Sequence, residues 1–553
     1  MITMDPARPR AEAVAFSGGS VLAVGSRSEV VRRAGSGARV VDLGGGSLLP
    51  GFIDPHHHLF LVAADPWSCR LHGRSPHNIP ELLEEIRRVS AADDSGGWLR
   101  VHGYQPLALA ERRSPTAAEL DSICPDRPLH LLGLTYHESS LNSAGLARLG
   151  WDRQSTDPPG GRIARDRHGR PTGVLIESAS FLAEAASRES MLVDGGGQDW
   201  IDRAERHSLA LARVGITRIG DAAVPPSGMA LYEQAAAAGR LAVTVHRFPV
   251  GADAISEPAN ITDPTGTGDP RIPVGPAKLL ADGGERCELC LTTRQVLYSV
   301  SSTLRATFSR GMLAATVANR GGWARHGPDG RYHTGIRVLS DNRLRHDVLA
   351  AAERGMQVAV HAVGNGAVTG SVDAFAEARG ALSGLPGRPR LEHVMVLDLP
   401  LAERIAGVDA LVVTQPVFLQ DLGDELTVLP LPPPLRLLAL RTLLDAGVTV
   451  AASSDFPAGS FDPLVGIRAA VTRRLPDGSI AGPDEAVSTE EALRLYTSSA
   501  AETLGMTGRA GVLADGAAAD FVLLSEDPLT TDPDRLGELR VVQTWVDGRL
   551  VIG

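Results

Sequence analysis

The sequence predicts an α/β protein, a distorted (β/α)8 TIM barrel with an inserted subdomain and a small β-sandwich domain built from both chain ends. Three observations lead to this prediction. Short apolar runs alternate with helical patterns along the middle of the 553-residue chain, residues 60–200 interrupt that alternation, and strand-like segments occupy both ends. The predicted domains are residues 1–50, the barrel with its insert over 51–504, and residues 505–553.

The chain ends are predicted to form strands separated by turns, in segments 13–25, 519–528 and 541–553. We expect the two ends to pair in one small β domain.

Eight apolar runs, rich in Val and Ile and ending in polar residues or glycine, are typical of a parallel sheet that is covered on its outer face. Eight strands with helices between them describe a (β/α)8 barrel, whose active site lies at the carboxyl ends of the strands. The runs are 51–58, 215–221, 241–248, 277–284, 357–365, 390–396, 410–417 and 448–457.

Helical patterns lie between and after these runs. Segment 200–215 predicts one helix, and segment 342–355 predicts another that ends at a glycine. The last helix is expected to begin at a capping box of Ser488 and Glu491 and to continue to Gly505. The glycines at 195–197 are interpreted as a turn.

The composition excludes several classes of partner. A net charge of −11 argues against phosphate backbones and anionic membranes, and 4% aromatic residues argue against base stacking. No apolar run reaches the length of a membrane span, and the opening residues lack a secretory pattern. Four cysteines are too few for a disulfide framework. We expect a cytoplasmic protein with a small-molecule partner, and a homodimer as the commonest oligomer.

One basic residue differs from all the others. Among 54 basic residues, Lys278 is the only lysine. Arginine cannot replace lysine where a deprotonatable amine is needed, because guanidinium stays charged. Either Lys278 has a chemical role or it is a chance survivor of an arginine-rich bias.

Polar side chains close several predicted strands. In IDPHHH, alternation places Asp54, His56 and His58 on one face and His57 on the other. Two imidazoles in this spacing can hold a metal ion, although a polar strand end explains the motif equally well. Further candidates at strand ends are Lys278, His361, His393 and Asp455. Each alone is typical of a hydrogen-bonded structural group, but barrel strand ends converge, and His and carboxylate ligands suit Zn²⁺.

At these residues the chain resembles the amidohydrolase superfamily. The resemblance extends from LLPGFIDPHHH through VAVHAVGNGAV and LEHVMV to SSDFPAGSFDPL and AGVLADGAAADFVLLSEDPL. In the insert, LTYHESSLNSAGL (134–146) and PTGVLIESA (171–179) resemble the amidohydrolase 3 branch, which includes N-substituted formamide deformylase.

The resemblance implies a site with two divalent metal ions, most simply Zn²⁺. His56, His58 and Asp455 would hold the more buried ion, and His361 and His393 would hold the second. Lys278 would bridge both ions after CO₂ adds to its amine, because the carbamylated lysine carries two oxygens and a negative charge. A buried amine flanked by cations has a lowered pKa and can react in its neutral form.

Two such ions trap a hydroxide between them and polarise a carbonyl group. Asp455 is expected to take the proton of that hydroxide and to pass it to the departing amine. The implied activity is hydrolysis of a non-peptide C–N bond of amide type, as in an N-substituted formamide. His137, Asn142, Tyr136 and Glu177 are candidate substrate contacts, each with a local structural hydrogen bond as the alternative. His246 is expected to support the wall of the site.

Some features depart from the family pattern. Asn365 stands where the family usually has Asp, so the metal affinity or the pH profile is expected to differ. Relatives generally begin with a further strand, whereas this chain opens at ITMD; either the β domain lacks an edge strand or the true start lies upstream. Cys287 and Cys290 form a CxxC motif without a second pair, and we expect them to be packing residues.

Two other interpretations stay open. A mononuclear deaminase or cyclic-imine hydrolase of the same superfamily needs no bridging lysine, so Lys278 argues against it. A non-catalytic barrel that serves as a scaffold typically loses metal ligands, whereas all six are present here.

Overall fold

The computed structural model describes the whole chain except residues 69–75, 94–95, 262, 311–323, 383 and 427–430. Each of the eight predicted runs contains a strand, and the eight strands form two parallel sheets with the orders β12-β11-β4 and β13-β17-β18-β20-β22. They are β4 (Phe52–His57), β11 (Ile216–Val224), β12 (Thr244–Pro249), β13 (Ala277–Leu280), β17 (Val358–Ala362), β18 (Arg390–His393), β20 (Leu411–Thr414) and β22 (Val450–Ala452).

The two sheets approach each other at both of their edges. Strand β22 lies beside β4, and β12 lies beside β13. At the first junction the Asp455 backbone N–H donates to the His56 carbonyl at 2.9 Å. Hydrogen-bonded ladders do not continue across either junction, so the α/β architecture is observed and closure into a barrel stays a prediction.

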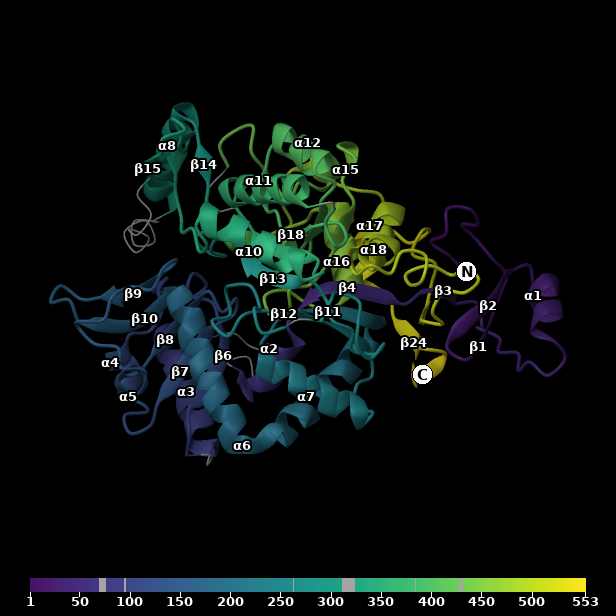
Figure 1. Cartoon of the computed structure of the whole chain (residues 1–553), viewed down its shortest axis with the longest axis horizontal. Helices are drawn as coiled ribbons and strands as arrows, with labels where there is room; N and C mark the ends of the chain where they lie inside the picture. Colours follow the sequence, from purple (N-terminus) through teal and green to yellow (C-terminus); the bar gives the residue numbers. More distant parts are fainter. Residues whose placement is uncertain (69–75, 94–95, 262, 311–323, 383, 427–430) are drawn as a thin grey trace.

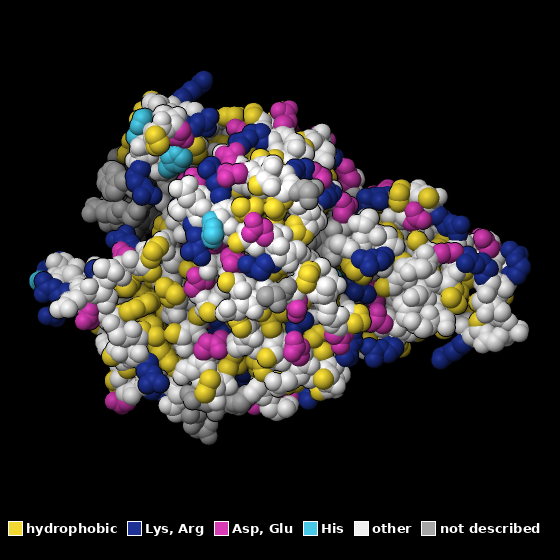
Figure 2. Space-filling model, viewed as in Figure 1, with side chains coloured by type: hydrophobic (Ala, Val, Ile, Leu, Met, Phe, Trp, Pro, Cys, Tyr) yellow, Lys and Arg dark blue, Asp and Glu magenta, His cyan; other side chains and the backbone are white. Residues whose placement is uncertain are grey.

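Helices cover the outer faces of these sheets (Figure 1). Ser340 caps α10, accepting from the Arg343 N–H, and Gly355 follows that helix at φ 77°, as predicted. The covering helices are α2 (Leu59–Ala64), α6 (Ser178–Arg213), α7 (Pro226–Ala237), α10 (Asp341–Glu353), α11 (Asn365–Ala381), α12 (Leu399–Gly407), α15 (Leu440–Asp445) and α16 (Pro463–Thr472). Figure 2 shows acidic and basic side chains interspersed over the visible surface.

Helix α6 differs from its prediction. It begins at Ser178, so residues 200–213 form only its last part and the glycines at 195–197 lie within it instead of in a turn. Glycine lowers helix stability by about 1 kcal/mol per residue, which tertiary packing can offset. Trp200 supplies such packing, because it is fully buried and its indole N–H donates to the Phe60 carbonyl at 3.1 Å.

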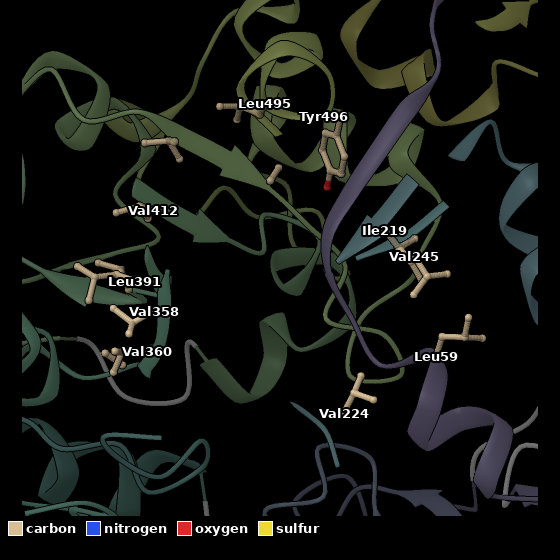
Figure 3. Packing of buried hydrophobic residues seen from close by; sticks show 14 of the residues in the cluster. Leu59, Ile219, Val224, Val245, Val358, Val360, Leu391, Val412, Leu495 and Tyr496 are labelled. Carbon is tan, nitrogen blue, oxygen red and sulfur yellow. The ribbon is translucent and has the colours of Figure 1, made fainter. Parts of the chain in front are cut away.

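The hydrophobic core lies between the strands and the covering helices. Ile219, Val245 and Val360 point from three strands into one cluster of buried residues (Figure 3). Burying such a side chain contributes about 1.5–3 kcal/mol relative to leaving it exposed. The core therefore holds the strand ends, and the side chains that they carry, in fixed positions.

The insert forms its own sheet at the lower left of Figure 1. Its strand order is β5-β6-β7-β8-β10-β9, and a separate apolar cluster that includes Ile79, Leu82 and Leu131 packs against it. The strands are β5 (Trp67–Ser68), β6 (Leu99–Tyr104), β7 (Leu129–Gly133), β8 (Glu138–Leu141), β9 (Gly161–Arg165) and β10 (Pro171–Glu177), and the helices are α3 (Ile79–Ala92), α4 (Ala117–Asp121) and α5 (Ser143–Leu149).

The two chain ends share a sheet of order β25-β24-β23-β3, in which Leu49 pairs with Val522. The N-terminal hairpin of β1 (Ala13–Ser17) and β2 (Ser20–Gly25) packs with this sheet, because Val21 shares an apolar cluster with Leu48 and Phe521. A β-sandwich and the domain boundaries stay predictions. The other strands of this region are β3 (Ser47–Pro50), β23 (Phe521–Leu524), β24 (Val541–Val546) and β25 (Arg549–Ile552), and its helix is α1 (Arg27–Ala34).

The predicted last helix is two short helices, α17 (Thr489–Leu495) and α18 (Ser498–Thr503). The capping box of Ser488 and Glu491 is present. The break occurs because the Tyr496 carbonyl accepts from the Ile53 N–H of β4 at 2.9 Å instead of from a following helical turn.

The remaining elements are short or peripheral. Among the described residues, no helix combines the length and the apolar character that crossing a membrane requires. These elements are α8 (Thr293–Arg310), α13 (Phe418–Asp421), α14 (Gly423–Leu426), β14 (Cys290–Leu291), β15 (Arg325–His326), β16 (Tyr332–His333), β19 (Val396–Leu397) and β21 (Arg436–Leu437).

Candidate metal centre

A cavity opens at the carboxyl ends of the strands. All six side chains predicted as metal ligands line it, and Tyr136 and His137 of the insert form part of its wall. The predicted ligands are His56, His58, Lys278, His361, His393 and Asp455.

The strand register explains why these residues meet. Lys278 lies on β13, His361 on β17 and His393 on β18, three neighbouring parallel strands whose carboxyl ends lie at one edge. His56 lies on β4, His58 directly follows β4, and Asp455 follows β22, which lies beside β4. Residues far apart in the sequence are thereby brought to one cavity.

Asp54 does not share the cavity, contrary to the predicted alternation. Its carboxylate lies 3.0 Å from His57 Nδ1 and accepts from the Ser454 hydroxyl. The pairing of β4 with β11 shifts register opposite this segment, and such a bulge breaks the alternation of faces.

His56, His58 and Asp455 bring three ligand atoms within 4.8 Å of one another. His58 donates through Nδ1 to the Ala222 carbonyl at 2.7 Å, so the Nε2 of its neutral form is an acceptor. Nε2 nevertheless lies 3.0 Å from a second acceptor, Asp455 Oδ1. A proton or a metal ion between these two atoms would satisfy both, and imidazole and carboxylate are ligands that suit a divalent metal ion.

A buried ion pair orients His56. The His56 Nδ1–H donates to Glu392 Oε2 at 2.6 Å, and Arg390 binds the same carboxylate at 2.9 and 3.1 Å. This contact leaves His56 Nε2 directed toward the cavity, 3.4 Å from Asp455 Oδ1. Metal-binding histidines are commonly held by a carboxylate in this way.

His393 and His361 form the other side of the centre, with ring centroids 4.4 Å apart. Gln415 Oε1 lies 2.9 Å from His393 Nδ1 and fixes that ring. Among the described residues, the buried Nε2 of His361 has no hydrogen-bond partner. A buried ring nitrogen without a partner is costly, and a bound cation would satisfy it.

Lys278 is buried beside these histidines, with its amine nitrogen 3.2 Å from His56 Nε2. Burial lowers the pKa of Lys278 to about 8. A neutral amine is therefore accessible near neutral pH, as carbamylation requires.

The electrostatics of the centre favour neutral imidazoles and an ionised carboxylate. Burial lowers the pKa of His56 to about 3 and that of His393 to about 4, and the pKa of His361 is also lowered by burial. Burial alone would raise the pKa of Asp455, but the hydrogen bond with His58 and the neighbouring His56 lower it below its ordinary value. Neutral imidazoles and carboxylates are the forms that bind metal ions.

The predicted substrate contacts divide into two groups. Tyr136 and His137 line the cavity, and the ring of His137 lies 5.1 Å from that of His361. Glu177 lies behind His137, with its Oε2 2.5 Å from His137 Nδ1, and does not line the cavity. Burial opposes protonation of His137, but Coulombic attraction to Glu177 and the hydrogen bond that Glu177 accepts from the ring raise the pKa of His137.

Asn142 is not among the residues that line the cavity, although it was a candidate substrate contact. Its side-chain oxygen accepts from the Gly145 N–H and caps α5, and its amide nitrogen donates to the Cys124 and Arg127 carbonyls. These contacts use its hydrogen-bonding groups within the insert.

His246 and Asn365 also lie away from the cavity lining. His246 is buried on β12, as expected of a residue that supports the wall. Asn365 exchanges hydrogen bonds of 2.9 Å with the backbone N–H and C=O of Cys290, so it holds a neighbouring loop instead of a ligand.

Sequence reasoning missed Glu392, Gln415 and Asp282. Asp282 accepts from the backbone N–H groups of Val363 and Gly364, which directly follow the strand of His361. A signal was available for Glu392, because RLEH places two opposite charges two residues apart, on one face of a strand that is predicted to be buried. No comparable signal marks Gln415.

Strained backbone accompanies these positions. His393 and Asp455 have φ values of 76° and 51°, and Tyr136 and Glu177 have values of 63° and 53°. Non-glycine residues rarely adopt positive φ, and such strain concentrates at functional sites. The cavity therefore has the backbone character of a functional site.

Comparisons with known proteins agree with this geometry. Residues 39–552 match the sequence model of the amidohydrolase family. The chain is 31% identical to N-substituted formamide deformylase of Arthrobacter pascens, over 99% of this chain and 96% of that protein.

Solved structures show the likeness of the fold. A metal-dependent hydrolase from Pyrococcus furiosus superposes with a TM-score of 0.66 at 23% identity, over 96% of this chain and 98% of that one. One from Pyrococcus horikoshii OT3 gives a TM-score of 0.66 at 20% identity, over 94% of each chain.

Proposed function

Because the chain belongs to the amidohydrolase family, we propose that it cleaves a non-peptide C–N bond of amide type, as in an N-substituted formamide, at a centre of two divalent cations. Its membership of the family makes it a hydrolase of carbon–nitrogen bonds. The bond type, the two-ion centre and a closed (β/α)8 barrel around it are parts of the proposal.

One observation carries the proposal. Six side chains from the ends of five strands line one cavity, and the only lysine of the chain is buried among them. A scaffold protein has no need of this arrangement. His56, His58 and Asp455 would hold one cation, and His361 and His393 would hold the other, with Zn²⁺ as the ion that suits these donors.

Bound divalent cations would lower the pKa of a water molecule and polarise the substrate carbonyl. Asp455 is ionised and reaches the cavity, so its carboxylate can accept a proton from water. It then donates that proton to the amine nitrogen as the C–N bond breaks, because an amide anion is a poor leaving group. General acid and base catalysis of this kind contributes about 10²–10⁴-fold.

Lys278 is proposed to form a carbamate. Its neutral amine adds to CO₂ with formation of an N–C bond, and the proton displaced from nitrogen leaves to solvent. The product turns a buried cation into an anion with two oxygens. A carbamate anion beside His56 offsets the positive charge of two cations. Arginine, the commonest basic residue of this chain, could not supply such an anion.

The cavity wall indicates a small substrate with an apolar substituent. His137, held by Glu177, and Tyr136, whose hydroxyl donates to Asp65 at 2.6 Å, line the cavity, and we propose that they contact the substrate. Thr135, Glu184 and Arg188 are further polar residues of the insert in that lining. The rest of that wall is mostly apolar, and its residues include Leu61, Leu134, Phe181, Val250 and Leu280.

A mononuclear deaminase or cyclic-imine hydrolase is the second candidate. It is favoured by one observation, because only His56, His58 and Asp455 place ligand atoms within mutual binding distance among the described residues of this cavity. Lys278 would then have no ligand role.

Metal content and product analysis distinguish these functions. The protein is stripped with a chelator, reloaded with Zn²⁺ and assayed for formate release from N-substituted formamides and for ammonia release from amino-heterocycles. We expect metal-dependent formate or acid release with two ions per chain. Ammonia release with one ion would establish the deaminase, and no turnover by the reloaded protein would establish the scaffold.

A further inference from the structure

A second group of metal-ligating side chains lies outside the cavity, on the small sheet β14-β16-β15. Cys290, Asp329 and His333 place their ligand atoms within 4.8 Å of one another. His333 Nε2 lies 3.1 Å from Asp329 Oδ2, and Cys290 Sγ lies 4.0 Å from the same oxygen. This sheet lies at the upper left of Figure 1, and Figure 2 shows histidine side chains at the surface there.

The orientation of His333 suits a ligand. Its Nδ1 lies 3.3 Å from the carboxylate of Glu288, which Arg337 also binds. This contact leaves Nε2 as the atom that faces Asp329 and Cys290. A metal-binding histidine is commonly oriented by a carboxylate that binds the ring nitrogen remote from the metal. Glu288 supplies that carboxylate here, and it does not line the catalytic cavity.

The backbone holds the three side chains together. Cys290 and His333 are direct partners across the β14–β16 pair, and Asn365 binds both the N–H and the C=O of Cys290 at 2.9 Å. Gly327 lies against the pair, because a Cβ at this position would be 2.5 Å from Asp329 Oδ1 and 3.0 Å from the His333 ring. The absence of a side chain there allows Asp329 and His333 to meet.

We propose that Cys290, Asp329 and His333 bind one divalent cation of the zinc class. The ligands are the Cys290 sulfur, a carboxylate oxygen of Asp329 and Nε2 of His333, with water in the fourth position. The Cys290 S–H bond breaks when the sulfur–metal bond forms, and its proton leaves to solvent. The ion would join the 325–333 hairpin to the loop that ends at Cys290.

Cys287, the other cysteine of the CxxC motif, has a different environment. It packs against an apolar cluster that includes Leu291 and Val363, and burial raises the pKa of its thiol well above its ordinary value. It is not among the three grouped ligands. Cys287→Ser is therefore a matched control for Cys290→Ser.

The two metal sites have distinct spectroscopic signatures. A thiolate bound to Co²⁺ gives a sulfur-to-cobalt charge-transfer band in the near ultraviolet, whereas nitrogen and oxygen ligands do not. The catalytic centre contains no cysteine. Titration of the metal-free full-length protein with Co²⁺ therefore reports the proposed site separately from the catalytic one.

We expect the band to appear in the wild type and in Cys287→Ser, and to disappear in Cys290→Ser. His333→Gln should weaken binding at least tenfold while keeping the band at high Co²⁺. Absence of the band in the wild type, or its persistence in Cys290→Ser, would overturn the proposal. If Cys290→Ser does not fold, as judged by circular dichroism, His333→Gln decides: unchanged Co²⁺ affinity refutes the site. Neither result bears on amide hydrolysis, which the formate assay tests.

Discussion

At the scale of single residues, arginine and lysine have different places in this chain, although the two are often exchanged for each other. Arginine serves at the surface and in buried ion pairs such as Arg390 with Glu392. Lysine occurs once, in a buried position 3.2 Å from a predicted metal ligand. The difference between the two side chains is that only the lysine amine can lose its proton and react.

Lys278→Arg is therefore expected to lower kcat by more than about 10²-fold, because the loss of a metal ligand should lower activity at least as much as the loss of a group that orients one. Metal content should fall in parallel. Lys278→Ala should lose activity equally but regain part of it in millimolar propionate, whose carboxylate can occupy the position of the carbamate. Arginine leaves no room for such rescue. Full activity of Lys278→Arg, with both ions bound, would refute a role for the amine.

Asp455→Asn tests the proton transfer. The amide cannot accept or return a proton, so kcat is expected to fall by about 10²–10⁴-fold. Metal analysis accompanies the kinetics, because Asp455 also lies 3.0 Å from His58 and contributes to the binding of the ion. Asp398→Asn is the control, since Asp398 caps α12 and asparagine caps equally well. Asp455→Asn with wild-type turnover and metals in place would exclude the role.

At the scale of elements, β18 carries charges where a buried strand is normally apolar. Arg390 and Glu392 are both fully buried, and together they hold His56 on β4. The pair joins two strands that belong to different hydrogen-bonded sheets. We therefore assign Glu392 a positioning role for the metal centre.

Glu392→Gln should weaken metal binding about 10–100-fold, because the amide is a poorer acceptor for the His56 Nδ1–H. Competition with a chromogenic chelator measures this affinity without recourse to turnover. Glu377→Gln, on the exposed face of α11, is the matched control and should bind metal like the wild type. Equal affinities of Glu392→Gln and the control would show that the buried pair serves stability alone.

Sequence patterns were reliable for elements in which local and global preferences agree. The eight apolar runs each contain a strand, and the capping box at Ser488 and the glycine after α10 mark real helix ends. The six predicted ligands followed from the rule that parallel strand ends converge, and they do line one cavity. Tertiary contacts decided the other positions.

Three departures illustrate the tertiary effect. Packing of Trp200 continues α6 through three glycines, and β4 divides the last helix by taking the Tyr496 carbonyl. A bulge turns Asp54 away from the cavity. Gln415 could not be found from the sequence, because a single amide gains its meaning only when the fold places it against His393. The same holds for Asn142, whose structural role depends on contacts within the insert.

At the scale of the whole molecule, the metal centre joins the two sheets. Its ligands come from β4 of one sheet and from β13, β17, β18 and the loop after β22 of the other. Without bound cations, this junction buries several histidines that must stay neutral. The stability of the metal-free protein should then depend on pH.

The sign follows from the proton balance. His56 and His393 have pKa values of about 3 and about 4 in the folded chain, against about 6.5 when unfolded. Below pH 6.5 the unfolded chain therefore binds more protons, and the free energy of unfolding falls as pH falls. Asp455 and Glu392 have lowered pKa values, so their stabilising contribution persists until the pH approaches the ordinary carboxyl range near 4. Between pH 7.5 and 5.5 six buried histidines with lowered pKa values act in this direction. Burial raises the pKa values of Asp221, Asp282 and Glu285 to about 6, 7 and 7, so these three carboxyls act in the opposite direction and reduce the size of the effect.

We expect the melting temperature of chelator-stripped protein to be lower at pH 5.5 than at pH 7.5. At one pH unit below 6.5, each of His56 and His393 lowers the free energy of unfolding by about 1 kcal/mol. Differential scanning calorimetry in buffers of equal ionic strength measures the shift. His56→Gln replaces one titrating ring by an uncharged amide and should reduce the pH dependence, whereas His168→Gln, on an exposed turn of the insert, should leave it unchanged. A melting temperature that does not change between these pH values would mean that the rings are not held neutral, and that the centre is more open to solvent than its burial implies.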